Sequence, residues 1–121
     1  MIVFVTGGRE YDDELTVRSV LSPYGPGDIL IVGGAPGADE IARQTWHDKQ
    51  LPYVVVPAAW TRYGRAAGPF RNDLMVTGNA LSPYVPGLLL PEICHAFAGD
   101  RGTEDAVQRA TKQEIEVIRH R

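Results

Sequence analysis

Four glycine-rich turns divide this chain, and each follows a short apolar run. They lie at residues 7–9, 33–37, 64–68 and 99–103. At such a turn the backbone N–H groups can approach a bound anion, and a helix that starts there adds its positive N-terminal end. The pattern therefore predicts alternating strands and helices whose connecting turns bind a small molecule that carries an anionic group.

The apolar runs have the composition of buried strands. Their residues are mostly β-branched and aliphatic, and an uninterrupted apolar run is typical of a parallel strand that is covered on both faces. We expect strands at residues 2–5, 28–32, 53–56, 92–97 and 115–118. Apolar residues at helical spacing lie between these runs. We expect helices at residues 12–21, 38–50, 69–78 and 103–114, the third with Phe70, Leu74 and Met75 facing the core.

This order of elements predicts an α/β fold. Strands that alternate with helices form a parallel sheet through right-handed crossovers, here a doubly wound sheet of about five strands in the order 3-2-1-4-5. A chain of 121 residues is long enough for a single domain, over residues 1–121. In such a sheet, ligands bind where the strand order reverses, beyond the carboxyl ends of the first and fourth strands. The turns at residues 7–9 and 99–103 are therefore expected at the site.

Polar side chains in and beside the turns can contact the ligand. Arg9, Arg65 and Arg71 offer guanidinium groups that pair with phosphate, and a solvated surface position is the alternative for each. Thr103 either caps its helix or binds a phosphate, and Asp39 either caps its helix or accepts a ribose hydroxyl. The expected ligand-binding residues are Gly7, Gly8, Arg9, Gly33, Gly34, Gly37, Asp39, Arg65, Arg71, Gly99, Gly102 and Thr103.

Composition and charge narrow the range of partners. The net charge is −3 and the lysines and arginines form no basic stripe, so nucleic acid is not the expected partner. No apolar run approaches the ~20 residues of a membrane span, so we expect no membrane contact. The first residues lack the basic start of a signal peptide, and we therefore expect a cytoplasmic protein.

The sequence contains no recognisable cofactor or metal motif. The turn at residues 33–37 has no lysine followed by serine or threonine, as a P-loop requires, and no G-x-G-x-x-G pattern opens a helix. Neither an ATPase nor an NAD-dependent enzyme is indicated. Cys94 and the three histidines lack metal-ligand spacing, so we expect neither a metal nor a cofactor. Cys94 is expected inside a strand, and His47 and His120 in solvent.

One segment interrupts the alternation of strands and helices. Residues 81–91 contain three prolines and five aliphatic residues. An apolar loop of this length usually covers another surface. It either packs over the chain's own core or forms a subunit contact, and we expect a homo-oligomer that uses this segment or the third helix.

Four ordered motifs resemble those of a YpsA-related SLOG domain. They are Thr6-Gly7-Gly8-Arg9 with Tyr11-Asp12, Gly33-Gly34-Ala35-Pro36-Gly37-Ala38-Asp39, Gly64-Arg65-Ala66-Ala67-Gly68-Pro69-Phe70-Arg71-Asn72 and Gly99-Asp100-Arg101-Gly102-Thr103. The resemblance spans nearly the whole chain. It implies a Rossmann-like, three-layer domain that binds a nucleotide or a nucleotide-derived ligand, as a sensor or binding protein. The SLOG superfamily is related to the lonely-guy phosphoribohydrolases and to the DNA-uptake protein DprA. A nucleotide-processing hydrolase and a protein that binds single-stranded nucleic acid are therefore the alternatives.

The resemblance to the lonely-guy enzymes is partial at their catalytic positions. Arg71, Asn72 and Met75 resemble their Arg-Lys-x-x-Met stretch, but Ala106 stands where their Pro-Gly-Gly-x-Gly-Thr-x-x-Glu motif has its glutamate. Without that carboxylate, N-glycosidic hydrolysis needs another acidic group. The candidate catalytic residues are Arg71, Asp105 and Glu104, with Asp39 as a further carboxylate. We expect binding rather than catalysis.

Overall fold

The structure, a computed structural model, describes residues 1–58, 63–77 and 90–120. Its centre is a five-stranded sheet in the order β3-β2-β1-β4-β5, and all neighbouring strands are parallel. The strands are β1 Ile2–Thr6, β2 Ile29–Gly33, β3 Tyr53–Val56, β4 Ile93–Phe97 and β5 Glu116–His120. The predicted α/β fold and its strand order are confirmed.

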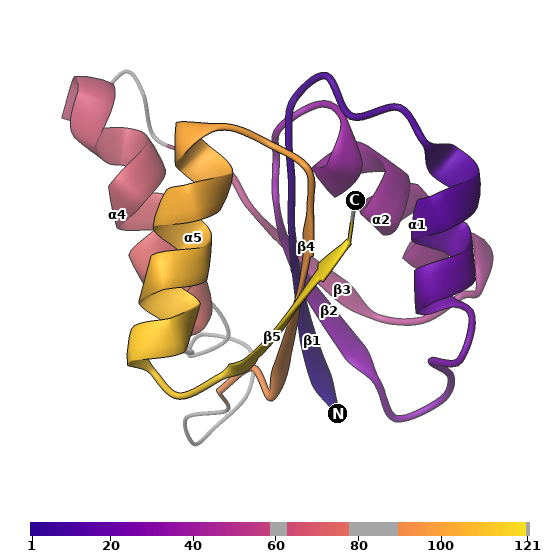
Figure 1. Ribbon diagram of the computed structural model, residues 1–121. Helices are drawn as coiled ribbons and strands as arrows, with labels where there is room; N and C mark the ends of the chain where they lie inside the picture. The colour runs from indigo at the N-terminus through magenta and orange to yellow at the C-terminus, as the bar shows by residue number, and fades with distance from the viewer. Residues whose placement is uncertain (59–62, 78–89, 121) are drawn as a thin grey trace.

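Helices cover both faces of this sheet. Within the described residues, α1 Glu14–Leu21 and α2 Ala38–Asp48 lie on one face, and α4 Ala67–Val76 and α5 Arg101–Lys112 lie on the other (Figure 1). A short 3-10 helix, η1 Gly64–Ala66, leads directly into α4. The result is the three-layer, Rossmann-like arrangement.

β1 is the central strand, and all five of its residues are buried. Val3 and Val5 pack in a cluster with Trp46 and the other buried residues of α1 and α2. Ile2 and Phe4 pack on the opposite face, against the buried residues of α4 and α5. Because both faces of β1 are covered, every position of the strand must be apolar or small, which explains why its apolar run is continuous.

Lys49 joins the ends of α1 and α2. It follows α2, and its ammonium group donates hydrogen bonds to the carbonyl oxygens of Leu21, Ser22 and Tyr24, at 2.7, 3.1 and 2.7 Å. The last carbonyls of a helix have no partner within the helix, and a cation stabilises them through both hydrogen bonds and the helix dipole. Lys49 therefore caps α1 from a position 28 residues beyond Leu21.

Three helices begin at residues other than those expected, and one of them is α5, which begins at Arg101 rather than at residue 103. α1 begins at Glu14 rather than at residue 12, because the Asp13 side chain accepts a hydrogen bond from the Thr16 N–H at 3.1 Å and caps the helix. α4 begins at Ala67, two residues before Pro69. Met75 is buried as predicted, but the prediction that Phe70 faces the core is wrong. Phe70 is 49% exposed and stacks on Tyr63, with ring centroids 5.0 Å apart.

The histidines of the last two strands form a partly buried polar group with Tyr24. The Tyr24 hydroxyl and His95 Nε2 are 2.7 Å apart, and His95 Nδ1 and His120 Nε2 are 2.8 Å apart. His120 also stacks on Phe97, with ring centroids 5.0 Å apart. The prediction that His120 lies in solvent is therefore wrong, because β5 extends to this residue and places its ring against β4. Cys94 is fully buried inside β4, as predicted.

Residues 81–89, most of the segment expected to cover a core or contact a subunit, lie outside the described residues. The homo-oligomer stays a prediction. Across residues 1–58, 63–77 and 90–120, the structure contains no helix with both the length and the apolar character needed to cross a membrane. The same ranges contain no group of three or more histidine, cysteine, aspartate or glutamate side chains placed to hold a metal ion.

Candidate functional site

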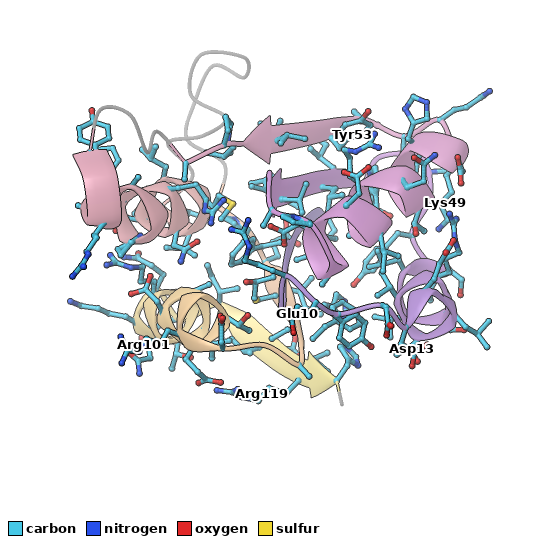
Figure 2. The ribbon with its side chains drawn as sticks, turned by 90° about the horizontal axis from the view of Figure 1, so that it is seen from above. Glu10, Asp13, Lys49, Tyr53, Arg101 and Arg119 are labelled. Carbon is cyan, nitrogen blue, oxygen red and sulfur yellow. The ribbon has the colours of Figure 1, made fainter. Side chains whose placement is uncertain are left out.

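The loops that follow the carboxyl ends of the strands surround a cavity of about 670 Å³. Its walls come from the end of β1, the first turn of α2, one side of α4 and the first turns of α5. The cavity lies beside β1 and α5, where the strand order reverses between β1 and β4. Figure 2 looks onto this edge and shows Glu10, in the loop after β1, between Arg101 at the start of α5 and Asp13 before α1. We call this space the main cavity because Asp39 and Arg71 both line it; a neighbouring hollow of about 740 Å³ is lined by Gly8, Gly99 and the residues that follow β1.

Asp39 and Arg71 meet over Gly33, the last residue of β2. Asp39 comes from the first turn of α2 and Arg71 from α4, so the two side chains belong to helices on opposite faces of the sheet. A Cβ atom on Gly33 would stand 2.6 Å from Arg71 Nη1 and 2.8 Å from Asp39 Oδ2. Any larger residue at this position would displace one of the two groups. The glycine therefore leaves room for a carboxyl and a guanidinium group to face the main cavity together.

The Asp39 carboxyl is unusually buried for an ionisable group. Asp39 is 6% exposed, and its Oδ2 accepts a hydrogen bond from the Ala35 N–H at 3.3 Å. Burial raises the pKa of Asp39 to about 6, and the charges of Arg71 and Arg9 together with the Ala35 hydrogen bond oppose this rise. The carboxyl can therefore hold or release a proton near neutral pH.

Arg71 is half-buried beside this carboxyl. Burial lowers the pKa of Arg71 and the neighbouring Asp39 raises it, but an arginine remains charged at neutral pH in either case. Its Nε donates to Asn72 Oδ1 at 3.1 Å, and this is the one hydrogen bond of the Arg71 side chain to a described residue. No described residue accepts a hydrogen bond from the Nη groups of Arg71.

Asn72 holds Arg71 in place by linking α4 to α5. The Asn72 Nδ2 group donates to Asp105 Oδ2 at 2.9 Å and to the Gly102 carbonyl at 3.3 Å, and Asn72 is 4% exposed. Asp105 also accepts a hydrogen bond from Arg109 Nε at 2.9 Å. Asp105, a predicted catalytic candidate, thus takes part in fixing the two helices.

The N-terminus of α5 is capped by the chain itself. Asp100 is the N-cap, and its Oδ1 accepts a hydrogen bond from the Gly102 N–H at 3.2 Å. Thr103 lies within the first turn rather than before it, so of its two predicted roles the one as helix cap is wrong. The Thr103 side chain is buried against Gly99, and its hydroxyl has no hydrogen-bond partner among the described residues. Glu104, also on the cavity wall, forms an ion pair with Arg119 at 2.7 Å.

Tight contacts between loops account for several of the predicted ligand-binding glycines. A Cβ atom on Gly8 would stand 2.7 Å from the Ala98 carbonyl oxygen. Cβ atoms on Gly7, Gly37 and Gly99 would overlap Ala38, the Gly8 carbonyl and the Thr103 hydroxyl, respectively. These glycines let the loops after β1, β2 and β4 pack against one another, which positions the cavity walls whether or not a ligand contacts the glycines themselves.

The structure brings most of the predicted site residues to this edge, but not all of them. The walls of the main cavity include Gly7, Arg9, Asp39, Arg71, Gly102 and Thr103. Gly34 instead lines a smaller cavity beside Arg71. Arg65 lies in η1, is exposed, and is not among the described residues that line either cavity. Asn72 was missed as a positioning residue, because its partner Asp105 is 33 residues away in the sequence.

Protein-family models, curated proteins and solved structures gave no match. The resemblance to a SLOG domain therefore stays a prediction that depends on the four motifs, and the site must be interpreted from its own geometry.

Proposed function

We propose that this protein binds a nucleotide or a nucleotide-derived ligand in the main cavity. The observation that carries the proposal is the Asp39 and Arg71 pair over Gly33, at the edge where doubly wound sheets bind ligands. Arg71 offers unused N–H donors to an anionic group. Asp39, when ionised, accepts hydrogen bonds from sugar hydroxyls. One ligand that carries an anion and a sugar satisfies both side chains.

The rest of the wall suits the less polar part of such a ligand. Val5, Pro69 and Met75 line the same cavity; Pro69 is exposed, whereas Val5 and Met75 are buried. Small-molecule sites typically combine apolar walls with a few polar groups that orient the ligand. A nucleobase or a related ring is the part of a nucleotide that matches this surface.

Replacing Arg71 with alanine is expected to weaken binding of a nucleoside monophosphate by about 2 kcal/mol, because a charge-assisted hydrogen bond to phosphate is lost. Isothermal titration calorimetry measures this change. Arg65→Ala is the matched control, since Arg65 is an exposed arginine outside the cavity wall. Equal affinities of Arg71→Ala and the unmodified protein, with both folded by circular dichroism, would show that the ligand does not contact Arg71.

Hydrolysis of the ligand is a second candidate function, and Asp39 is the observation that favours it. A buried carboxyl with a pKa raised to about 6 can act as a general base near neutral pH. Ala106, at the position of the missing glutamate, has no carboxyl group, and its side chain is packed in the apolar core between α5 and the sheet. Among the candidate carboxylates, Asp105 and Glu104 are engaged by Arg109 and Arg119. Asp39 is thus the carboxyl best placed to replace the missing glutamate.

Product analysis decides between binding and hydrolysis. We expect the purified protein to bind nucleoside monophosphates without releasing free base, as chromatography of the incubated mixture would show. Release of free base that persists in Arg65→Ala but disappears in Asp39→Asn would instead establish a hydrolase that uses Asp39. Asparagine preserves the size of the side chain and removes its ability to take a proton, so a loss of turnover with retained binding separates the two roles.

A further inference from the structure

We infer that the anionic group of the ligand binds in a small side cavity between Arg9 and Arg71, and not at the N-terminus of α5. The inference rests on the proposed function and specifies where in that site the phosphate lies. The side cavity has a volume of about 230 Å³ and lies beyond the carboxyl ends of β2 and β3. It is lined by Arg9, Gly34, Ala35, Pro57, Ala58 and Arg71.

The charges on the two cavity walls differ in a way that favours the side cavity. Among the described residues that line it, two are arginines and none is acidic. The main cavity shares these two arginines and adds Arg101, but its wall also has four acidic residues, Asp39, Asp100, Glu104 and Asp105. Interactions between charges strengthen as water is excluded, so a phosphate is attracted most strongly where guanidinium groups outnumber carboxylates. The carboxylate of Asp39, which accepts the Ala35 N–H, lies next to the side cavity but does not line it.

The two arginines have unused hydrogen-bond donors. Arg9 makes no hydrogen bond or ion pair with any described residue, and Arg71 uses only its Nε, toward Asn72. Arg71 is nevertheless half-buried, and burial lowers its pKa. A partly desolvated guanidinium whose outer N–H groups lack partners is destabilising, and a bidentate oxyanion supplies the missing acceptors.

The alternative anion site, the N-terminus of α5, is already occupied by the chain's own carboxylate. Asp100 accepts the Gly102 N–H, and its backbone carbonyl accepts the Glu104 N–H at 3.0 Å. Glu104 adds a second carboxylate in the first turn. Glu104 is paired with Arg119, so it is mainly the Asp100 carboxylate that offsets the helix dipole and repels an incoming phosphate.

Arg71 lines both cavities and so connects them. A phosphate in the side cavity reaches Arg71 from one side, and the attached sugar then lies over Gly33 near Asp39, in the main cavity. The side cavity exceeds by several times the ~30 Å³ that one water molecule occupies, which leaves room for a phosphate. The ligand therefore spans the two cavities, with Arg71 between them.

Inorganic phosphate is the probe that locates this subsite without a variant. In a titration followed by ¹H–¹⁵N NMR, the amides of Ala35 and Ala58 should shift most, and those of Gly102 and Thr103 should shift least. The largest shifts at Gly102 and Thr103 would place the anion at α5 and overturn the inference. Shifts spread evenly over the surface would also overturn it.

A pair of variants at one position tests the charge argument. Ala58 lines the side cavity and is half-buried. We expect Ala58→Asp to weaken phosphate binding at least tenfold and Ala58→Lys to strengthen it. The matched control, Gln108→Glu, adds a negative charge to the wall of the main cavity and should change phosphate affinity less than threefold. A greater loss in Gln108→Glu than in Ala58→Asp would contradict the assignment.

Titrations with inorganic phosphate and with a nucleoside monophosphate distinguish a failure of this inference from a failure of the proposed function. If phosphate binds between the arginines but no nucleoside monophosphate binds more tightly than phosphate itself, the side cavity is an anion site and the nucleotide proposal is wrong. If a nucleoside monophosphate binds tightly and Ala58→Asp leaves its affinity unchanged, the nucleotide proposal stands and the position assigned to its phosphate is wrong.

Discussion

A Gly37→Ala variant is expected to lose about 3 kcal/mol or more of its free energy of unfolding. Gly37 precedes α2 with φ 82° and ψ −131°, a conformation that L-residues rarely adopt. The absence of a side chain at Gly37 is also required by packing. A Cβ atom there would stand 2.6 Å from the Arg9 carbonyl oxygen and would overlap the Gly8 carbonyl oxygen. The Ala38 N–H donates to the same Gly8 carbonyl at 3.2 Å, so neither loop can withdraw without losing this hydrogen bond.

Urea unfolding at pH 7 measures the effect, and Gly25→Ala is the matched control. Gly25 lies in another loop, its φ is not among the positive values, and a Cβ atom there meets no other atom within 4 Å. We expect the control to change the free energy of unfolding by less than about 1 kcal/mol. If the two variants have equal stability, the close contact between the loops after β1 and β2 does not exist in solution.

Acid is expected to destabilise the protein through His95, by about 3 kcal/mol between pH 7.5 and pH 4. Burial and the neighbouring His120 lower the pKa of His95 to about 4, from an ordinary value of 6.5. An unfolded chain takes up a proton on this histidine as the pH falls below 6.5, whereas the folded chain does not until about pH 4. The unfolded state thus binds more protons in this interval, and the free energy of unfolding falls as the pH falls.

A His95→Gln variant isolates this contribution. Glutamine does not titrate and can still form a hydrogen bond with the Tyr24 hydroxyl, so its unfolding free energy should change less between pH 7.5 and pH 4 than that of the unmodified protein. The raised pKa of Asp39 acts in the opposite direction, adding stability as the pH falls through about 6, but it does so in both proteins and cancels in the difference. Identical pH profiles of the two proteins would rule out the His95 contribution.

The fold could be predicted because each strand and helix is indicated by residues that are close together in the sequence. The run at residues 2–5 is apolar at every position, and the structure buries all of it on the central strand. Each strand is followed by a turn and an amphipathic segment, and this alternation alone leads to a parallel, doubly wound sheet. Phe70 was placed wrongly because the apolar stripe of α4 is weak, and its ring is instead paired with Tyr63 outside the core.

The site was harder to predict because its contacts join distant parts of the sequence. The glycine turns correctly indicated the edge of the sheet, but the sequence cannot distinguish a glycine that approaches a ligand from one, such as Gly8, that approaches another loop. Asp100 and Thr103 are both good helix caps, and only the observed hydrogen bond to Gly102 identifies Asp100. No sequence pattern connects Asn72 with Asp105.

Asp39 and Arg71 belong to helices on opposite faces of the sheet, and a ligand that contacts both would therefore affect how the helices stay packed on it. α2 packs on one face of the sheet and α4 on the other, so the two side chains are near each other only while both helical layers remain docked. A small molecule that contacts both residues would link the two helical layers across the edge of the sheet. Its binding energy opposes detachment of either layer, so each helical layer should separate from the sheet more easily when the ligand is absent.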